Sequence, residues 1–268
     1  MFIIVSIPTR LLRTIPGARL EQLYYSPIGP LLVKGFTVLS FAKKGEKPYR
    51  IHDIMINIDI SKPGERAIPF NAYEPAVKQK LLELLNSNDI VIDVGSWIGY
   101  YALLCAKKAL KVIAIEPSSD SVKRIRENIA LNQFQNIEVL NCAIGEKRGL
   151  GKVKPGLGSS MDQVIENKGD EMAVTVESLD SIVLQRKYHK VDLVIMDIEG
   201  YEYYALLGMK QILSKHLVRN MIIEVHPQFL TRHHVSDNDI SAILYSNGYS
   251  VEEISRVKTG QYHLHAYL

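Results

Sequence analysis

Short apolar segments alternate with segments of helical periodicity over most of this chain, and this alternation limits the possible folds more than any other feature. Residues 90–94 (Ile-Val-Ile-Asp-Val) are almost wholly apolar, as expected of a strand that is covered on both faces. The preceding residues 75–85 have helical spacing, with Val77, Leu81, Leu82 and Leu85 expected on one face. Such alternation predicts a parallel sheet with helices on both faces.

The same pattern predicts further elements along the chain. We expect strands at residues 111–116, 137–141, 172–177, 191–198 and 220–225, and helices at residues 100–109, 118–131, 178–185, 201–214 and 237–246. Residues 249–257 and 262–268 then read as two strands with a four-residue connection, which is short enough to require antiparallel pairing. The predicted fold is therefore α/β and Rossmann-like, with a mostly parallel sheet that closes in a C-terminal antiparallel hairpin.

The first part of the chain has a different character. Proline and glycine punctuate it, and residues 51–60 alternate between apolar and polar side chains like a half-buried strand. We predict a β-rich N-terminal extension over residues 1–70 and a main domain over residues 71–268. The apolar run at residues 1–12 is too short to span a bilayer, although a weak contact with a membrane surface is conceivable.

Composition excludes several classes of protein. Hydrophobic residues make up 47% of the 268 residues and charged residues 23%, which argues against disorder. The net charge of +3 is too small and too scattered to predict a nucleic-acid partner. The two cysteines form no C-x-x-C pair, so we expect neither a disulfide framework nor a cysteine zinc site, and we predict a cytoplasmic protein. Oligomeric state is not readable from the sequence.

A glycine loop follows the strand at residues 90–94. Glycines at such a point let the backbone turn sharply and let a ligand approach closely. The loop lacks the third glycine of the dinucleotide fingerprint, and its preceding Asp93 would repel a pyrophosphate. S-adenosylmethionine carries a sulfonium and an ammonium, which suit this carboxylate. We therefore predict a cofactor site that includes Asp93, Gly95, Ser96, Gly99 and Tyr100, with a simple structural turn as the alternative.

Two later strand ends complete the predicted cofactor site. Glu116 ends the next strand, where an acid can accept hydrogen bonds from both hydroxyls of a ribose. Cys142 and Ala143 follow the third strand, and their small side chains leave room for an adenine ring. A surface acid and ordinary close packing are the respective alternatives.

Acidic side chains gather at the ends of two further strands. Asp197 and Glu199 leave the strand predicted at residues 191–198, and Gly200 allows a tight entry into the next helix. Carboxylates at such a buried edge are costly unless they are used or hydrogen-bonded. Glu224 and His226 end the following strand on a shared face, and a histidine can accept a proton near neutral pH.

The chain resembles the FkbM-type branch of the S-adenosylmethionine-dependent methyltransferases. The resemblance rests on Ala72-Tyr73-Glu74-Pro75, Val91 to Tyr101, Ala143-Ile144-Gly145, Val191-Asp192-Leu193, Asp197-Ile198-Glu199-Gly200-Tyr201-Glu202 and Ile222-Ile223-Glu224-Val225. It implies a seven-stranded sheet and O-methylation of a hydroxyl, often on a sugar, a glycan or a polyketide-like product. It also implies that Glu74, Asp93, Gly95 and Glu116 contact the cofactor, while Asp197 and Glu199 face cofactor and substrate. Trp97 and residues 1–70 depart from the family pattern.

Methyl transfer to an alcohol needs an aligned acceptor and a base. We expect Asp197 or His226 to take the proton, with Glu199 and Glu224 orienting the acceptor. Nothing in the sequence forces a metal, and none is predicted, but a divalent ion held by Asp197, Glu199 and either Glu224 or His226 is an open variant. Three other functions are weighed against this one: an RNA or DNA methyltransferase, an NAD-dependent oxidoreductase, and a non-catalytic module that binds S-adenosylmethionine.

Overall fold

The computed structural model describes residues 45–62, 64–154, 163–164 and 172–268. The chain divides into two compact units, Met1–Gln79 and Lys80–Leu268. The boundary that the sequence predicts between residues 70 and 71 stays a prediction. The part of the predicted β-rich extension at residues 1–44 lies outside the described residues, as does most of the glycine-rich stretch before residue 172.

The described part of the N-terminal unit is built on an antiparallel strand pair, β1 (Lys47–Ile51) and β2 (Ile54–Ile58). The strand expected at residues 51–60 is interrupted because His52 and Asp53 adopt left-handed conformations, with φ of 49° and 62°, and form the turn between the two strands. A 3-10 helix, η1 (Glu65–Phe70), follows, and the buried carboxylate of Glu65 accepts a hydrogen bond of 2.7 Å from the Asp59 amide. Helix α4 (Pro75–Leu84) begins at a proline, as predicted.

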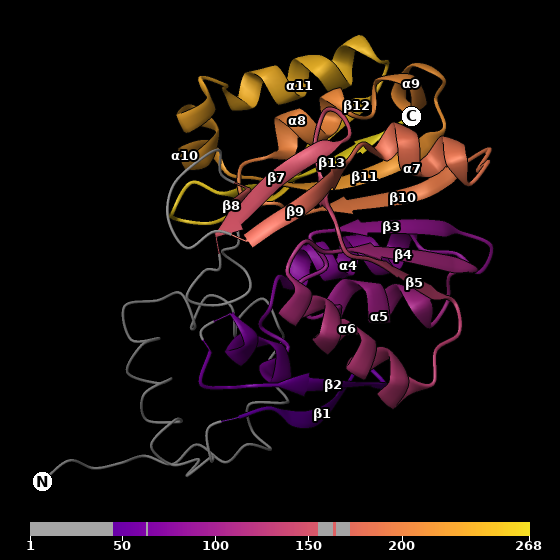
Figure 1. The fold of residues 1–268 in the computed structure, drawn as a ribbon, viewed down its shortest axis with the longest axis vertical. Helices are drawn as coiled ribbons and strands as arrows, with labels where there is room; N and C mark the ends of the chain where they lie inside the picture. Colours follow the sequence, from indigo (N-terminus) through magenta and orange to yellow (C-terminus); the bar gives the residue numbers. More distant parts are fainter. Residues whose placement is uncertain (1–44, 63, 155–162, 165–171) are drawn as a thin grey trace, which may run out of the picture. The chain divides into compact units, whose positions relative to one another are not determined.

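A seven-stranded sheet forms the centre of the C-terminal unit (Figure 1). Its strands are β3 (Ile90–Val94), β4 (Lys111–Ile115), β5 (Ile137–Leu140), β10 (Val191–Met196), β11 (Val218–Val225), β12 (Ser250–Arg256) and β13 (Tyr262–Tyr267). Their order is β12-β13-β11-β10-β3-β4-β5, and only the pairs that include β13 are antiparallel. The predicted Rossmann-like fold with its C-terminal hairpin is confirmed.

Side chains alternate between the two faces of this sheet because successive residues of a strand point in opposite directions. Ile92, Val94 and their neighbours on β4, β10 and β11 pack in one core with α7 (Leu179–Gln185), α8 (Glu202–Leu207), α9 (Lys210–Ser214) and α11 (Asp237–Ser246). Helices α5 (Tyr100–Ala106) and α6 (Ser119–Asn132) lie on the other face (Figure 1). Burial of each large aliphatic side chain in such a core contributes about 1.5–3 kcal/mol.

A second, four-stranded sheet has the order β6-β9-β7-β8. Its strands are β6 (Ala143–Ile144), β7 (Gly149–Lys154), β8 (Gln163–Val164) and β9 (Met172–Glu177). The strand expected at residues 172–177 is confirmed, but β7 lies in a stretch that reads as irregular because it is rich in glycine and lysine. Pairing with β9 makes it a strand, since the backbone hydrogen bonds of the ladder offset a weak local preference.

The helix expected at residues 201–214 is two helices, α8 and α9. They are separated at Gly208, which lies so close to the backbone of Gly145 that a Cβ there would be 2.1 Å from the Gly145 carbonyl oxygen. The carbonyl oxygen of Gly208 accepts a hydrogen bond of 2.8 Å from the Asp180 amide at the start of α7. The break is therefore imposed by packing rather than by local propensity.

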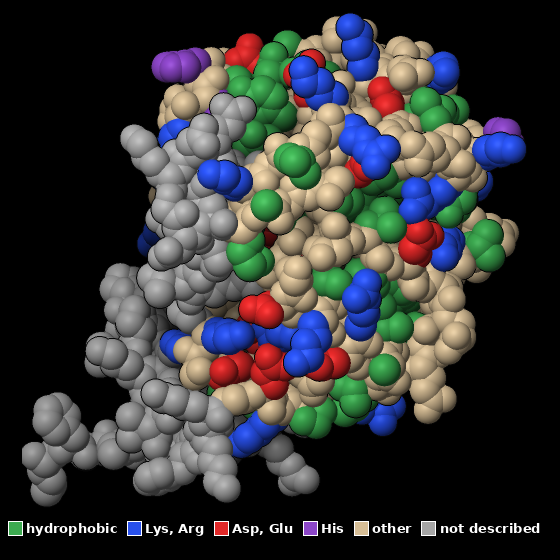
Figure 2. Space-filling view, in the orientation of Figure 1, with side chains coloured by type: hydrophobic (Ala, Val, Ile, Leu, Met, Phe, Trp, Pro, Cys, Tyr) green, Lys and Arg blue, Asp and Glu red, His purple; other side chains and the backbone are tan. Residues whose placement is uncertain are grey.

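The surface carries mixed charge. On the face drawn in Figure 2, lysine and arginine side chains are dispersed and interspersed with acidic ones, as expected from a net charge of +3. The helices of the described residues all fall short of the length and apolar character that a bilayer crossing requires.

The loops that follow β3 and β10 contact each other through their backbones. Gly95 has φ of +82°, and a Cβ built on it would lie 1.8 Å from the carbonyl oxygen of Asp197. The amide of Asp197 in turn donates to the carbonyl oxygen of Val94 at 3.0 Å. Only glycine meets both the sign of φ and the lack of space.

We expect Gly95→Ala to lower the free energy of unfolding by more than about 2 kcal/mol, because the added methyl group meets backbone and the conformation disfavours a side chain. Chemical denaturation followed by circular dichroism measures this. Gly149→Ala is the control, since nothing lies within 4 Å of its added Cβ. A loss for Gly95→Ala no larger than the loss for Gly149→Ala would contradict the steric argument.

Candidate functional site

The predicted cofactor loop lies between β3 and α5, next to the point where the strand order reverses. β4 lies on one side of β3 and β10 on the other, and ligands of open α/β sheets bind beyond the carboxyl ends of strands at such a point. The amides of Gly95 and Ser96 both donate to the carbonyl oxygen of Ile115, at 2.9 and 3.1 Å. Gly99, with φ of +85°, is the N-cap of α5, and Tyr100 is buried in its first turn.

Asp93 is buried beneath this loop with 2% of its surface exposed. Its Oδ2 has no hydrogen-bond partner among the described residues. Burial raises the pKa of Asp93 to about 7, and contacts with Ser96 and the backbone of Ala102 offset this only in part. A buried carboxylate with unused hydrogen-bonding capacity suits a cationic ligand, because a nearby positive charge favours the ionised form that burial disfavours.

Glu116 is also buried, and its side chain links the glycine loop to the end of β4 through hydrogen bonds. Its Oε2 accepts a hydrogen bond of 2.9 Å from the Trp97 amide, and its Oε1 accepts one of 2.9 Å from the Ser118 amide. Trp97, the residue that departs from the family pattern, adopts φ of +50°, and Glu116 holds its amide in place. Each carboxylate oxygen has a second lone pair, so the side chain retains capacity to accept from ribose hydroxyls.

Cys142 and Ala143 are both buried after β5. Cys142 packs in the main core with Ile144, and Ala143 packs with Val153 and Val174 of the smaller sheet. Burial, together with the charge of Glu177, raises the pKa of the Cys142 thiol to about 11, against the smaller effect of Arg186, so the thiol keeps its proton. The neighbouring Asn141 was not among the predicted site residues. Its Nδ2 donates to the carbonyl oxygens of Glu116 and Pro117, which ties the ends of β4 and β5 together.

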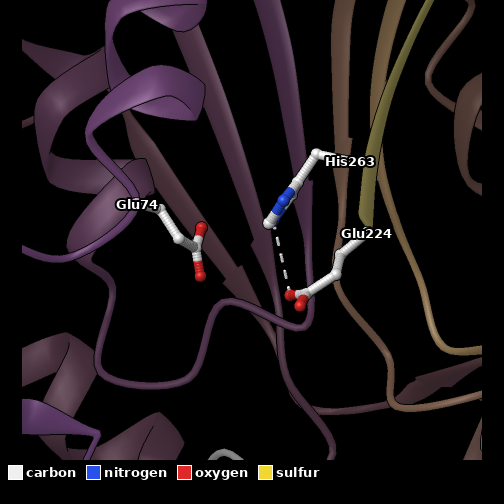
Figure 3. A group of neighbouring side chains, drawn as sticks. All are labelled: Glu74, Glu224 and His263. Atoms are coloured by element: carbon white, nitrogen blue, oxygen red, sulfur yellow. Dashed lines mark ion pairs between the residues drawn. The ribbon is translucent and has the colours of Figure 1, made fainter. Parts of the chain in front are cut away.

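Glu74 belongs to the N-terminal unit, where it precedes α4 with φ of +40°. Its predicted contact with the cofactor stays a prediction. The side chain is labelled in Figure 3 together with Glu224 and His263 of the C-terminal unit.

The four predicted catalytic residues converge at the carboxyl ends of β10 and β11. His226 lies at their centre, with 1% of its side chain exposed. Its Nε2 lies 3.4 Å from Glu199 Oε2, 3.6 Å from Glu224 Oε1 and 3.8 Å from Asp197 Oδ1. We call Asp197, Glu199, Glu224 and His226 the acid–histidine cluster.

Two residues that sequence reasoning missed hold this cluster in place. Glu202 is fully buried, and its Oε1 accepts hydrogen bonds of 2.8 Å from His226 Nδ1 and from the Gly200 amide. His263, on β13, places its Nε2 3.6 Å from Glu224 Oε2 (Figure 3). Its Nδ1 lies 3.1 Å from Ser255 Oγ. The signal for Glu202 was its place as the last acid of the Asp-x-Glu-Gly-x-Glu segment, whereas nothing local marked His263.

The charges of the cluster shift one another's pKa values. Burial opposes a charged His226, but the hydrogen bond and charge of Glu202, with the charges of Glu224 and Glu199, raise its pKa to about 9. Burial works against ionisation of Glu224, yet the nearby His263 and His226 hold its pKa well below the usual range. Among the carboxylates around His226 Nε2, Asp197 is the most exposed, with 31% of its side chain accessible against 15% for Glu199 and 13% for Glu224.

An aromatic stack adjoins the cluster. The ring of Phe229, in α10 (Pro227–Leu230), stacks on His226 at 5.8 Å, and the Arg232 guanidinium lies 4.7 Å from the centre of the Phe229 ring. Gly200 makes this packing possible, because a Cβ there would lie 2.3 Å from the Cβ of Phe229. Aromatic faces and an arginine beside a reaction site are groups able to bind a polar acceptor.

The raised pKa of Asp93 makes a prediction about stability. Between about pH 4 and pH 7, Asp93 ionises in the unfolded chain but stays protonated in the folded protein. The free energy of unfolding therefore falls as the pH rises through this range. Asp93→Asn removes this loss, and we expect the variant to exceed the wild type by about 1–3 kcal/mol at pH 8, with a smaller difference at pH 5.

Urea unfolding at both pH values measures this difference. Glu146→Gln, which changes an exposed carboxyl group, is the control and should follow the wild type. A gain in stability for Asp93→Asn that is equal at the two pH values would contradict the assignment.

Known proteins resemble this chain over the region that holds these residues. A family model described as the methyltransferase FkbM domain matches residues 93–251. The hexuronic acid methyltransferase AglP of Haloferax volcanii is 30% identical over 154 residues, which are 57% of this chain and 62% of that protein. The tRNA (guanine(37)-N(1))-methyltransferase Trm5b of Pyrococcus abyssi is 25% identical over 92 residues, 34% of this chain and 26% of that protein. The crystal structure of methyltransferase FkbM from Methylobacillus flagellatus KT has 19% identity and a TM-score of 0.48, and the match covers 68% of this chain and 44% of that chain.

The chain thus spans less than two thirds of the length of each of these relatives. The family match begins at Asp93, ends at Val251 and includes the glycine loop and the whole acid–histidine cluster. Since it covers more than half of the chain, the resemblance predicted from the motifs is confirmed: this chain belongs to the FkbM family of S-adenosylmethionine-dependent methyltransferases.

Proposed function

We propose that the protein transfers the methyl group of S-adenosylmethionine to a hydroxyl of a sugar or glycan. The observation that carries the proposal is the backbone approach of Gly95 to Asp197, which sets the cofactor loop directly against the acid–histidine cluster. Methyl donor and acceptor must meet within a near-attack distance of about 3–3.5 Å, so the two half-sites have to adjoin.

Asp93 and Glu116 are the groups we assign to the cofactor. The carboxylate of Asp93 attracts the ammonium of the methionine moiety, directly or through water, and Glu116 accepts from the ribose hydroxyls. Gly95, Ser96, Gly99 and Tyr100 form the loop around the ligand, with Cys142 and Ala143 on the adenine side. Support comes from the family match and from the burial and unused oxygen of Asp93.

The acceptor reaction is an in-line displacement. The acceptor oxygen attacks the methyl carbon while the bond from that carbon to sulfur breaks, and S-adenosylhomocysteine leaves. The hydroxyl proton passes to Asp197, the most exposed carboxylate of the cluster. Glu199 and Glu224 orient the acceptor. His226 lies between these carboxylates and reduces the repulsion among their charges. Alignment alone can lower the barrier by about 7–11 kcal/mol.

A carbohydrate acceptor is supported by two observations. AglP, the relative reported above, is named for hexuronic acid. In addition, the Arg232 guanidinium lies over the Phe229 ring, which itself stacks on His226, and a guanidinium pairs well with a carboxylate. An RNA acceptor is the alternative, because tRNA and rRNA methyltransferases also match over shorter stretches.

The first test is isothermal titration of the protein with S-adenosylmethionine. We expect binding that Asp93→Ala and Glu116→Ala each weaken at least 10-fold, because each removes a charged or hydrogen-bonding contact to the ligand. Glu146→Ala is the matched control for the loss of a carboxyl group. Absence of binding by the wild type would overturn the proposed function, and retained affinity in Asp93→Ala would remove that residue from the site.

The second test measures transfer of a labelled methyl group to oligosaccharides with and without hexuronic acid. We expect transfer to the acidic sugars, and we expect Asp197→Asn to lower kcat at least 100-fold while cofactor affinity stays within a factor of about three, because general-base catalysis contributes roughly 100- to 10,000-fold. Transfer to RNA instead, with a salt-dependent gel shift, would favour the alternative acceptor.

A further inference from the structure

We propose that the acid–histidine cluster binds a divalent transition-metal cation through Asp197, Glu199 and His226, with Glu224 completing the set. The nearest ligand atoms of Asp197, Glu199 and His226 all lie within 4.8 Å of one another. The inference deepens the proposed function, because a metal at this point would bind the acceptor hydroxyl.

The spacing of the ligand atoms is the first argument. The contacts of His226 Nε2, at 3.4, 3.6 and 3.8 Å, exceed the 2.7–3.2 Å of an ordinary hydrogen bond to oxygen. In a tetrahedral site with bonds of about 2.0–2.2 Å, neighbouring ligand atoms are about 3.3–3.6 Å apart. The three separations from Nε2 match this spacing to within a few tenths of an ångström, so the imidazole lies at the distance from each carboxylate oxygen that a shared cation requires.

The orientation of His226 is the second argument. The buried carboxylate of Glu202 binds Nδ1 at 2.8 Å, which leaves Nε2, on a side chain that is 1% exposed, aimed at three oxygens from three different residues. Metal-binding histidines almost always bind a carboxylate, a carbonyl or water through their other ring nitrogen. Glu202 is therefore a positioning residue, and its own Oε2 has no hydrogen-bond partner among the described residues.

The balance of charge is the third argument. Asp197, Glu199, Glu202 and Glu224 bring four carboxylates into a largely buried space, where His226 and His263 are the facing imidazoles. Carboxylates that are grouped in such surroundings repel one another, and burial makes each of them costly to ionise. A divalent cation would balance the excess, and the ligand atoms, which are carboxylate oxygens and one imidazole nitrogen, suit manganese or zinc.

The exposure of the ligands indicates what the cation would do. The side chain of His226 is 1% exposed, whereas 31% of the Asp197 side chain is exposed and can be reached from solvent. A cation there would act as a Lewis acid on the acceptor hydroxyl and lower its pKa, which makes loss of its proton easier. In this arrangement the proton would pass to the Asp197 oxygen that does not bind the cation.

The test is metal binding by the full chain after dialysis against EDTA. Isothermal titration with Mn²⁺ and with Zn²⁺, supported by the electron paramagnetic resonance signal of bound Mn²⁺, measures stoichiometry and affinity without any methyl acceptor. We expect one equivalent to bind, with Glu199→Gln and His226→Gln weakening the affinity at least 10-fold. Glu202→Gln should weaken it by about 10- to 100-fold, because its effect acts through the orientation of His226.

The control is His189→Gln, a change at an exposed histidine, which should bind the metal like the wild type. If the wild type binds neither metal, or if Glu199→Gln binds it unchanged, the inference is overturned. Should His226→Gln fail to fold by circular dichroism, Glu199→Gln decides the matter. Titration of the EDTA-treated protein with S-adenosylmethionine separates the two proposals, because cofactor binding without metal binding would contradict this inference alone.

Discussion

The contact between the loops after β3 and β10 is the constraint on which the rest of this structure depends. Gly95 brings its backbone against the carbonyl oxygen of Asp197, and the Asp197 amide extends the ladder to Val94. One loop carries the predicted cofactor residues and the other begins the acid–histidine cluster. A side chain at Gly95 would meet the Asp197 backbone and force the two loops apart.

Near that contact, buried carboxylates accept hydrogen bonds from backbone amides and from a histidine. Glu116 secures the amides of Trp97 and Ser118, and Glu202 secures His226 and the Gly200 amide. Each carboxylate therefore fixes a backbone turn as well as a possible ligand site. This double use limits which residues can change, because removing one carboxylate leaves buried amide donors unsatisfied.

Much of the main fold could be predicted from local pattern, whereas contacts between distant segments could not. The apolar strands β3, β4, β10 and β11 were readable because burial on both faces imposes composition directly, and the final hairpin was readable from its short connection. Strand β7 was not, since Gly149 and Lys152 carry no β preference and the strand exists through its pairing with β9. Likewise the break at Gly208 depends on Gly145, a residue far away in sequence.

The sequence by itself determined the family, the Rossmann-like fold and the positions of Asp93, Glu116, Asp197 and His226 at strand ends, because each of these follows from periodicity and spacing along one segment. Only the tertiary structure decided which side chains meet. His226 and Glu202 are 24 residues apart, and Glu224 meets His263 from the antiparallel strand beside it. Such pairings depend on strand order and register, which arise from packing over the whole sheet and leave no mark on the local sequence.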